Sequence, residues 1–192
     1  METIFQNCKI KDQAPPQEGF CIFAFKWYLK VMKEKKFEFE YEVYEDISEL
    51  TEQDAWLLRE AMSMTEQAYA PYSNFHVGAV AILENGEIVA GTNQENASYP
   101  VGICAERVLL GSVATLHPNI PVKSIVISYS SDEVKSDHPI SPCGMCRQAL
   151  LEYETRLKKP IRLILGGMEG KVYIIKTATQ LLPFAFTKSE LG

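Results

Sequence analysis

Hydrophobic and polar side chains alternate strictly between Phe37 and Val43. In an extended chain the apolar residues at 37, 39, 41 and 43 share one face, and three glutamates occupy the other. This period of two residues predicts a half-buried strand. Because charged side chains discourage pairing with another chain, the glutamates also indicate that the strand lies at the edge of a sheet.

Between residues 51 and 69 apolar side chains recur every three or four positions, which predicts a helix. Thr51 is suited to cap the start of this helix, because its hydroxyl can accept a hydrogen bond from the backbone amide of Asp54. Pro71 follows the last turn and ends the helix there.

The rest of the pattern predicts five further strands and two further helices. Asn85-Gly86 is a two-residue hairpin turn between strands, and the apolar run Ile125–Ile127 indicates a strand covered on both faces. The strands are expected at 75–83, 87–92, 123–130, 162–165 and 171–176, the helices at 104–117 and 143–157, and a short capped turn at 177–182. This order predicts an α/β protein with a mixed sheet layered between helices.

Composition narrows the class of protein. The chain has 192 residues, 46% of them hydrophobic and 23% charged, with a formal net charge of −6. A chain of this size buries a sufficient core without disulfide bonds or a partner, and its acidic balance speaks against nucleic-acid binding. The apolar stretch Phe20–Phe25 is much shorter than the roughly 20 residues that span a membrane, and Met1-Glu2 lacks the positive start of a signal peptide. We therefore expect a cytoplasmic protein with reduced cysteines and no membrane partner.

Residues 1–31 differ from the rest of the chain. They contain Pro15-Pro16 and the isolated cysteines Cys8 and Cys21, and they show no sustained period of 2 or 3.6 residues. Regular patterning starts after Met32, so we expect residues 32–192 to form the folded domain and residues 1–31 to be an extension without a catalytic role. The alternative is that residues 1–31 form a short element packed on the domain.

Three cysteines carry the chemistry that the sequence suggests. Cys104 is followed by Ala105-Glu106, and Cys143 and Cys146 belong to the group Pro142-Cys-Gly-Met-Cys. Both groups fall at predicted helix starts, where free backbone amides and the helix dipole favour thiolates. Three thiolates fill three positions of a tetrahedral zinc and leave the fourth for water, which is typical of a catalytic site. Glu106 is the candidate that takes and returns the proton of that water.

Other interpretations of these residues remain open. The pair Cys143 and Cys146 has the spacing of a redox pair, and a structural four-thiolate zinc would need Cys8 or Cys21 as its fourth ligand. Glu106 alone could complement the dipole of its helix. The linkage between the two cysteine groups and Glu106 favours the catalytic zinc over these alternatives.

With these motifs the chain resembles the homotetrameric cytidine deaminase family. The shared blocks are Tyr69-Ala-Pro-Tyr-Ser-Asn-Phe75 with Val77-Gly-Ala79, Asn93-Gln-Glu-Asn-Ala-Ser-Tyr99, Cys104-Ala-Glu-Arg107, Pro142-Cys-Gly-Met-Cys-Arg-Gln148 and Leu181-Leu-Pro-Phe-Ala-Phe186. The resemblance implies a three-layer α/β/α sandwich with a mixed five-stranded sheet. It also implies hydrolytic deamination of cytidine and deoxycytidine to uridine and deoxyuridine with release of ammonia, as in pyrimidine salvage.

The resemblance assigns the metal and the proton transfer to four residues. Cys104, Cys143 and Cys146 would bind one zinc ion per chain. Glu106 would carry the proton of the attacking water to N3 of the pyrimidine and then to the leaving ammonia. Arg107 and Arg147 directly follow ligands; the resemblance points one or both at the thiolates, whose charge they would offset. A surface salt bridge is the alternative for either arginine.

The same resemblance names residues that would bind the nucleoside. Phe75 would stack on the base, Asn93 and Glu95 would bond the ribose hydroxyls, and the backbone amide of Ala105 would contact the pyrimidine carbonyl. Without the resemblance, Phe75 would be interpreted as a core residue of its strand.

The family pattern also implies a homotetramer with shared active sites. Tyr99 and Phe186 would be lent across subunit interfaces. Gln94 and Phe184 depart from the family pattern, so the width of the pocket and the sugar preference stay open. The three histidines match no ligand position and are expected to be ordinary surface or loop residues: His76, His117 and His138.

Three other functions compete with cytidine deamination. An aminohydrolase of a modified cytosine nucleoside would use the same chemistry on another substrate. A polynucleotide deaminase would need a basic groove for phosphates, which the acidic composition disfavours. A zinc-stabilised binding module without turnover would not depend on Glu106.

Overall fold

Six strands form one mixed sheet within residues 34–192, the part of the chain that the computed structural model describes. The strand order is β1-β6-β5-β4-β2-β3, where β4 and β5 are parallel and all other neighbours are antiparallel. The strands are β1 (Tyr41–Tyr44), β2 (Phe75–Leu83), β3 (Ile88–Thr92), β4 (Val122–Ser131), β5 (Arg162–Leu165) and β6 (Val172–Ile175). These are the six strands that the hydrophobic pattern predicts. The sheet has one strand more than the five that the resemblance implies, because β1 pairs with β6.

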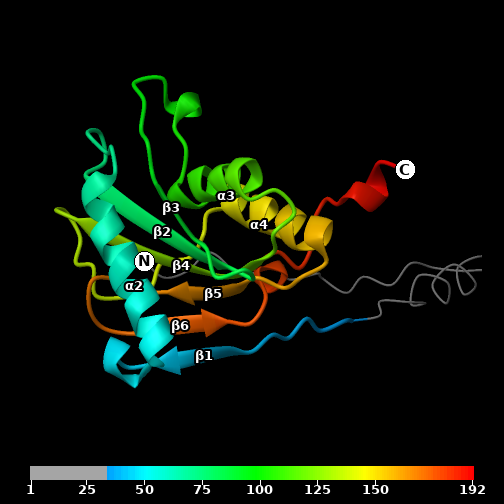
Figure 1. Ribbon diagram of the computed structural model, residues 1–192, viewed down its shortest axis with the longest axis horizontal. Coiled ribbons are helices and arrows are strands. Elements are labelled where there is room, and N and C mark those ends of the chain that lie inside the picture. Colours follow the sequence, from blue (N-terminus) through cyan, green and yellow to red (C-terminus); the bar gives the residue numbers. More distant parts are fainter. Residues whose placement is uncertain (1–33) are drawn as a thin grey trace, which may run out of the picture. The chain divides into compact units, whose positions relative to one another are not determined.

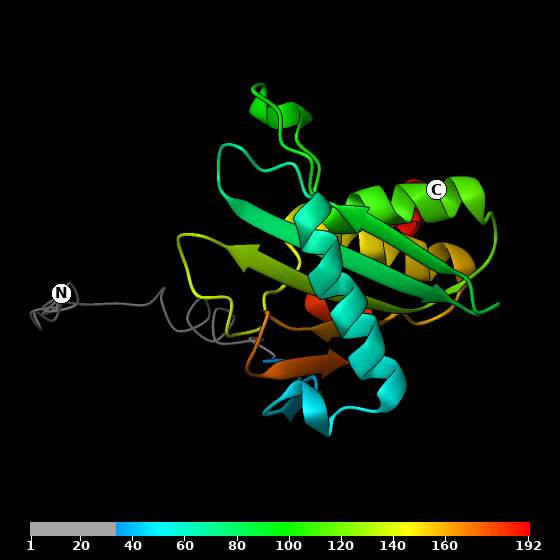
Figure 2. The same ribbon diagram turned by 60° about the vertical axis from the view of Figure 1, so that its left-hand side comes forward.

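Helices cover both faces of the sheet, which confirms the three-layer α/β fold (Figures 1 and 2). The α-helices are α2 (Glu52–Met64), α3 (Ala105–Leu116) and α4 (Gly144–Leu157), and short 3-10 helices include η2 (Thr65–Gln67), η3 (Tyr99–Val101) and η4 (Ala178–Leu181). One core lies between α2 and the sheet, and a larger core lies between the sheet and α3 with α4. None of the helices in the described residues is long and apolar enough to cross a membrane.

Local signals place most element boundaries correctly. The hydroxyl of Thr51 accepts a hydrogen bond of 3.2 Å from the amide of Asp54, so the predicted cap is confirmed. The helix itself ends at Met64 and continues as η2, shorter than expected but in the same segment. Gly86 has a φ of 87° in the hairpin turn between β2 and β3, a conformation that glycine adopts without strain.

The first strand is an edge strand, as its pattern indicates, but it is not half-buried. It begins only at Tyr41, and the side chains of Tyr41 and Val43 remain 46% and 48% exposed. Both residues pair with β6 opposite Ile175 and Tyr173, and so lie on the face that α3 and α4 cover elsewhere. Among the described residues, the buried core of that face includes no residue of β1. The alternation therefore predicts correctly which side chains share a face of the strand, but wrongly that this face is buried.

The extension at residues 1–31, with Cys8 and Cys21, lies outside the described residues, as does Met32. All of the elements above belong to one compact unit, Glu38–Gly192.

Candidate metal centre and active site

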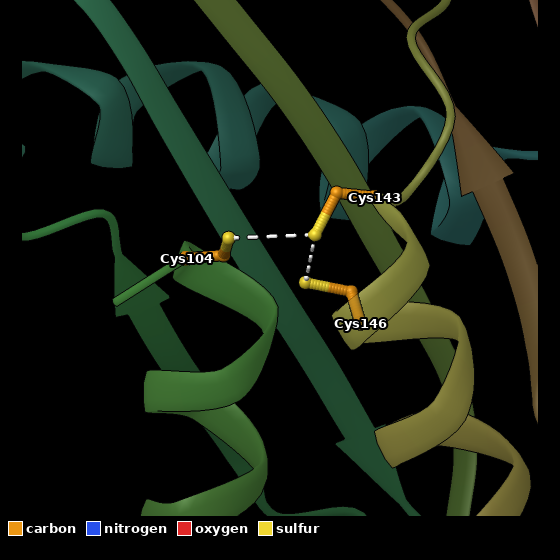
Figure 3. Close-up of side chains that lie close together, drawn as sticks. All are labelled: Cys104, Cys143 and Cys146. Atoms are coloured by element: carbon orange, nitrogen blue, oxygen red, sulfur yellow. Dashed lines mark hydrogen bonds between the residues drawn. The ribbon is translucent and has the colours of Figure 1, made fainter. Parts of the chain in front are cut away.

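Three cysteine sulfurs converge where α3 and α4 begin (Figure 3). The Sγ atoms of Cys104 and Cys143 are 3.7 Å apart, those of Cys143 and Cys146 are 3.5 Å apart, and all three lie within 4.8 Å of one another. Cys104 and Cys143 are the N-cap residues of their helices, and Cys146 lies in the first turn of α4. Residues separated by 39 positions in sequence are thus joined by the packing of two helix starts.

A close approach in the fold brings α3 to this position. A Cβ atom at Gly91 in β3 would lie 2.5 Å from the backbone nitrogen of Leu109 and 2.6 Å from the carbonyl oxygen of Ala105. A side chain at position 91 would therefore push the first turns of α3 away from the sheet. Because glycine has no side chain, the start of α3, which follows Cys104, can lie close to β3.

The two helix starts provide a setting that suits anionic sulfur. Neither Cys104 nor Cys143 makes a side-chain capping hydrogen bond to its helix, so the sulfurs are turned to each other and not to the backbone. A hydrogen bond from the Cys146 thiol lowers the pKa of Cys104 to about 6. The same contact with Cys104, together with burial, raises the pKa of Cys146. Three close thiol groups of this kind are the donor set that zinc prefers, so the residues present fit a zinc ion.

Glu106 lies in the first turn of α3 beside this cluster and is only 5% exposed. Burial raises the pKa of its carboxyl, and an interaction with the Cys146 thiol counters that rise only in part. A carboxyl with a raised pKa exchanges protons closer to neutral pH than an exposed one, which suits a general acid and base.

Phe75 begins β2 and stacks on Tyr129 of β4, with ring centroids 5.0 Å apart and planes inclined by 17°. Both side chains lie on the sheet face that α3 and α4 cover, the face of the cysteine cluster. Phe75 is half-buried, and so is neither a fully buried core residue nor an isolated surface ring. Tyr129 is not among the site residues predicted from the sequence, although the strand period places it on the same face as Ile127.

Asn93 and Glu95 both bond to the chain around the start of β2. Asn93 accepts from the amide of Val77 at 2.7 Å and donates to the carbonyl of Phe75 at 2.9 Å. Glu95 accepts from the amide of Tyr72 at 2.9 Å and from the hydroxyl of Ser73 at 2.5 Å. These contacts hold the loop before Phe75 in a defined conformation.

The two arginines that follow the ligands have different surroundings. Arg147 donates to the carbonyl of Pro142 at 2.8 Å and to the carbonyl of Leu181 at 3.3 Å, so it fixes the residue directly before Cys143. The charge of Arg107 helps to lower the pKa of Cys104. Ala105 is fully buried at the first position of α3.

Tyr99 and Phe186 are both directed outward within the single chain. Tyr99 is 77% exposed on η3, in a segment that projects away from the helices (Figures 1 and 2). The centroid of its ring lies 6.1 Å from that of Tyr72, in an edge-to-face arrangement. Phe186 is 60% exposed, and its carbonyl accepts a hydrogen bond of 2.8 Å from Gln148. His138 is exposed, as expected, but its ring lies 3.2 Å from the hydroxyl of buried Tyr129.

Comparison with known proteins points to one family. Residues 51–159 match the family described as the cytidine and deoxycytidylate deaminase zinc-binding region. The chain is 35% identical over 136 residues to a cytidine deaminase from Halalkalibacterium halodurans, covering 71% of this chain and 96% of that protein. A crystal structure of cytidine deaminase from Burkholderia pseudomallei is similar with a TM-score of 0.60 and 37% identity, covering 71% of this chain and 100% of the other. Blasticidin-S deaminase from Bacillus cereus is 28% identical over 152 residues, covering 73% of this chain and 96% of that protein.

Proposed function

The chain belongs to the cytidine and deoxycytidylate deaminase family, and from this membership we propose that it converts cytidine and deoxycytidine to uridine and deoxyuridine with release of ammonia. The observation that carries the proposal is the convergence of three cysteine sulfurs beside a buried carboxyl. A small nucleoside is the substrate that this family implies, and the acidic chain needs no basic groove to bind it.

Four residues carry the metal and the proton transfer in this proposal. Cys104, Cys143 and Cys146 hold zinc, which when bound polarises water and lowers its pKa. The Glu106 carboxylate accepts the proton that the attacking water loses as it adds to C4 of the pyrimidine. Glu106 gives this proton to N3. It then takes the second proton from the hydroxyl group that has been added at C4 and passes it to the amino group, which leaves as ammonia while the C4=O bond forms and the C4–N bond breaks. Its raised pKa supports both directions of transfer.

The remaining residues bind the substrate or support the metal ligands. Phe75 presents a half-buried aromatic ring for the base. Asn93 and Glu95 already bond to the chain around the start of β2, and in this proposal the remaining hydrogen-bonding capacity of their side chains binds the ribose hydroxyls. The amide of Ala105 stands at the first position of a helix, where backbone N–H groups lack intrahelical partners, and it binds the pyrimidine carbonyl. Arg107 offsets part of the charge of the three thiolates, and Arg147 supports the ligands by fixing the chain directly before Cys143.

A spectroscopic assay of two matched variants tests the mechanism. Wild-type protein containing one zinc per chain is mixed with cytidine, and the loss of ultraviolet absorbance is followed. Glu106→Gln removes the group that moves protons, so we expect kcat to fall by about 100- to 10,000-fold with zinc retained. Glu152→Gln changes an exposed glutamate of α4 and should leave the rate unchanged. No turnover by the wild-type zinc protein would contradict the proposed function, and full turnover by Glu106→Gln would contradict the role of Glu106.

The same assay separates the competing substrates. The similarity to blasticidin-S deaminase favours testing a modified cytosine nucleoside beside cytidine. We expect kcat/KM to be higher for cytidine than for blasticidin S, because the chain is more similar to the cytidine deaminases. A single-stranded oligonucleotide should not be deaminated, and its deamination would favour a polynucleotide deaminase.

The oligomer and the location also belong to this proposal. We propose a homotetramer in which Tyr99 and Phe186, both exposed in the single chain, complete the sites of neighbouring subunits. A cytoplasmic location suits the three cysteines, since ligating thiols stay reduced there.

We propose residues 32–192 as the catalytic domain and residues 1–31 as an extension without a catalytic role. Every site residue proposed above lies beyond position 74. A chain that lacks residues 1–31 should keep its kcat/KM for cytidine and its yield of folded protein. A large loss of either in this deletion would show that residues 1–31 are part of the domain.

A further inference from the structure

Tyr129 is completely buried in β4, and its ring is the one on which Phe75 stacks. In the register of β2 with β4, Tyr129 lies opposite Val77, two residues from Phe75 on the same face of the sheet. The centroid distance of 5.0 Å and the small inclination of 17° are those of a stacked pair and not of a casual contact. One face of Phe75 is thereby covered by the protein.

The hydroxyl of Tyr129 fixes the far end of the same ring. It donates a hydrogen bond of 3.0 Å to the carbonyl of Lys135, and a ring nitrogen of His138 lies 3.2 Å away. Burial raises the pKa of Tyr129, so the hydroxyl remains a donor. Because a buried ring held at both ends has little freedom to turn, Tyr129 offers a fixed surface to Phe75.

The loop that receives the hydroxyl is itself anchored to the sheet. The carbonyl of Ser136 accepts hydrogen bonds from the amides of Met168 and Glu169 at 2.7 and 3.2 Å, and its hydroxyl accepts from the amide of Ser131 at 3.1 Å. A Cβ atom at Gly167 would lie 2.3 Å from the same carbonyl, so the two loops are in close contact. This anchored loop continues to Pro142 and Cys143.

The backbone of Phe75 is hydrogen-bonded on both sides, whereas its side chain stacks on Tyr129. Its amide donates to the Ser73 hydroxyl at 3.1 Å, and its carbonyl accepts from Asn93 at 2.9 Å. Neither bond sets the plane of the ring. Tyr129 is the aromatic ring that stacks on it.

We propose that Tyr129 is a positioning residue for nucleoside binding, whose ring holds the ring of Phe75 in the plane that receives the pyrimidine. This inference rests on the proposed function, in which Phe75 stacks on the base. A ring that is already oriented binds the base without first losing rotational freedom. Loss of the Tyr129 ring should therefore raise KM and weaken the affinity for the nucleoside.

Two substitutions at position 129 separate the ring from the hydroxyl. Tyr129→Met keeps most of the volume and removes the aromatic face, so we expect KM for cytidine to rise about 3- to 10-fold, with kcat and zinc content nearly unchanged. Tyr129→Phe keeps the face and should restore KM to within about 2-fold of wild type. Tyr153→Met, at a buried tyrosine of α4 that contacts Arg156, controls for the general loss of a buried ring and should leave KM unchanged. An equal rise of KM in Tyr129→Phe and Tyr129→Met would overturn the inference.

A double-mutant cycle tests whether Tyr129 acts through Phe75. In the Phe75→Leu background, Tyr129→Met should change KM by less than about 2-fold, because the ring that it orients is gone. The same rise as in wild type would overturn the inference. If Phe75→Leu by itself leaves KM unchanged, the role of Phe75 in the proposed function fails. A raised KM in Phe75→Leu together with an unchanged KM in Tyr129→Met overturns the positioning role alone.

A measurement with Tyr129 in place does not depend on the folding of these variants. 3-Fluorophenylalanine placed only at position 75 reports on rotation of the ring through its ¹⁹F spectrum. A ring held by Tyr129 should give two signals in slow exchange in the zinc protein without nucleoside. A single sharp averaged signal would show that Phe75 turns freely and would overturn the proposal.

Discussion

Two glutamates, one in α3 and one in α4, are almost equally buried, yet their surroundings give them different chemistry. Glu106 is 5% exposed and Glu154 is 6% exposed. Glu154 accepts from the amides of Ile161 at 2.6 Å and Ala178 at 2.8 Å, and from the hydroxyl of Thr177 at 2.9 Å. Its oxygens are used by the chain, whereas Glu106 lies against the thiol of Cys146. Glu154 is therefore a structural carboxylate that joins α4 to β5 and η4.

This contrast predicts opposite results for the same substitution at the two positions. Glu154→Gln turns an NH₂ group toward backbone donors, so we expect a loss of about 1–3 kcal/mol in the free energy of unfolding. The rate of the folded variant should stay near that of wild type, whereas Glu106→Gln should lose its rate and keep its stability. Urea unfolding and the cytidine assay measure the two quantities. A stable Glu154→Gln with a greatly reduced rate would contradict this division.

Asp54 supplies a prediction for the pH dependence of stability. Burial of Asp54 acts to raise the pKa of its carboxyl. The guanidinium of Arg162 donates to the two carboxylate oxygens at 2.7 and 2.9 Å, and this contact lowers the pKa below its ordinary value. A carboxyl with a lowered folded-state pKa stabilises the fold above its unfolded pKa of about 4, and this stability is lost as the pH falls further.

We therefore expect Asp54→Asn to lower the free energy of unfolding by about 1–3 kcal/mol at pH 7 and by much less at pH 3. Urea titrations of both proteins at each pH give the difference, in which any loss of zinc in acid is common to the two. Asp132→Asn, at an exposed position after β4, is the matched control and should show no such pH dependence. A destabilisation by Asp54→Asn of the same size at both pH values would contradict the assignment.

At the scale of elements, the metal centre depends on where two helices begin. The sequence predicts both starts, because Cys104 and Cys143 directly precede runs with helical period. It does not predict how close α3 lies to the sheet, since that distance follows from the absence of a side chain at Gly91. The depth of β1 is unpredictable for a similar reason: period two identifies a face but not whether a helix covers it.

Two glycine substitutions test the position of α3. Gly91→Ala puts a methyl group within 2.6 Å of the α3 backbone, so we expect a loss of about 1–3 kcal/mol in stability and faster loss of zinc to a chelator. Gly111→Ala, in α3 where nothing lies within 4 Å of the new Cβ, should stabilise the helix by about 0.5–1 kcal/mol. Unfolding curves and the rate of zinc release distinguish the two. Unchanged zinc release in Gly91→Ala would show that the start of α3 does not depend on this close contact.

At the scale of the whole molecule, two exposed aromatic residues are the ones that the proposed homotetramer would bury between subunits. Tyr99 lies on a projecting segment and Phe186 near the C-terminal end, and both are directed outward in the single chain. In a closed homo-oligomer, each subunit can complete the site of a neighbour with such residues.

Mixing two impaired variants tests the shared site. Phe186→Ala lacks the lent residue and Glu106→Gln lacks the proton carrier, so each should be impaired alone. Co-expressed at equal levels, they should form mixed oligomers in which about one site in four combines both intact groups. Activity of the mixed oligomers that does not exceed the mean of the two separate variants would show that Phe186 serves its own subunit.

The sequence by itself determined the positions of the elements, the helix cap at Thr51 and the two cysteine groups at helix starts, because these depend on near neighbours in the chain. Tertiary structure alone decided that Tyr129 backs Phe75, that Glu154 is fully engaged while Glu106 faces the cysteines, and that the apolar face of β1 is exposed. These features depend on contacts between segments that are distant in sequence. The types of residues and their spacing do not reveal how far a helix extends over a sheet or which donors reach a buried carboxylate.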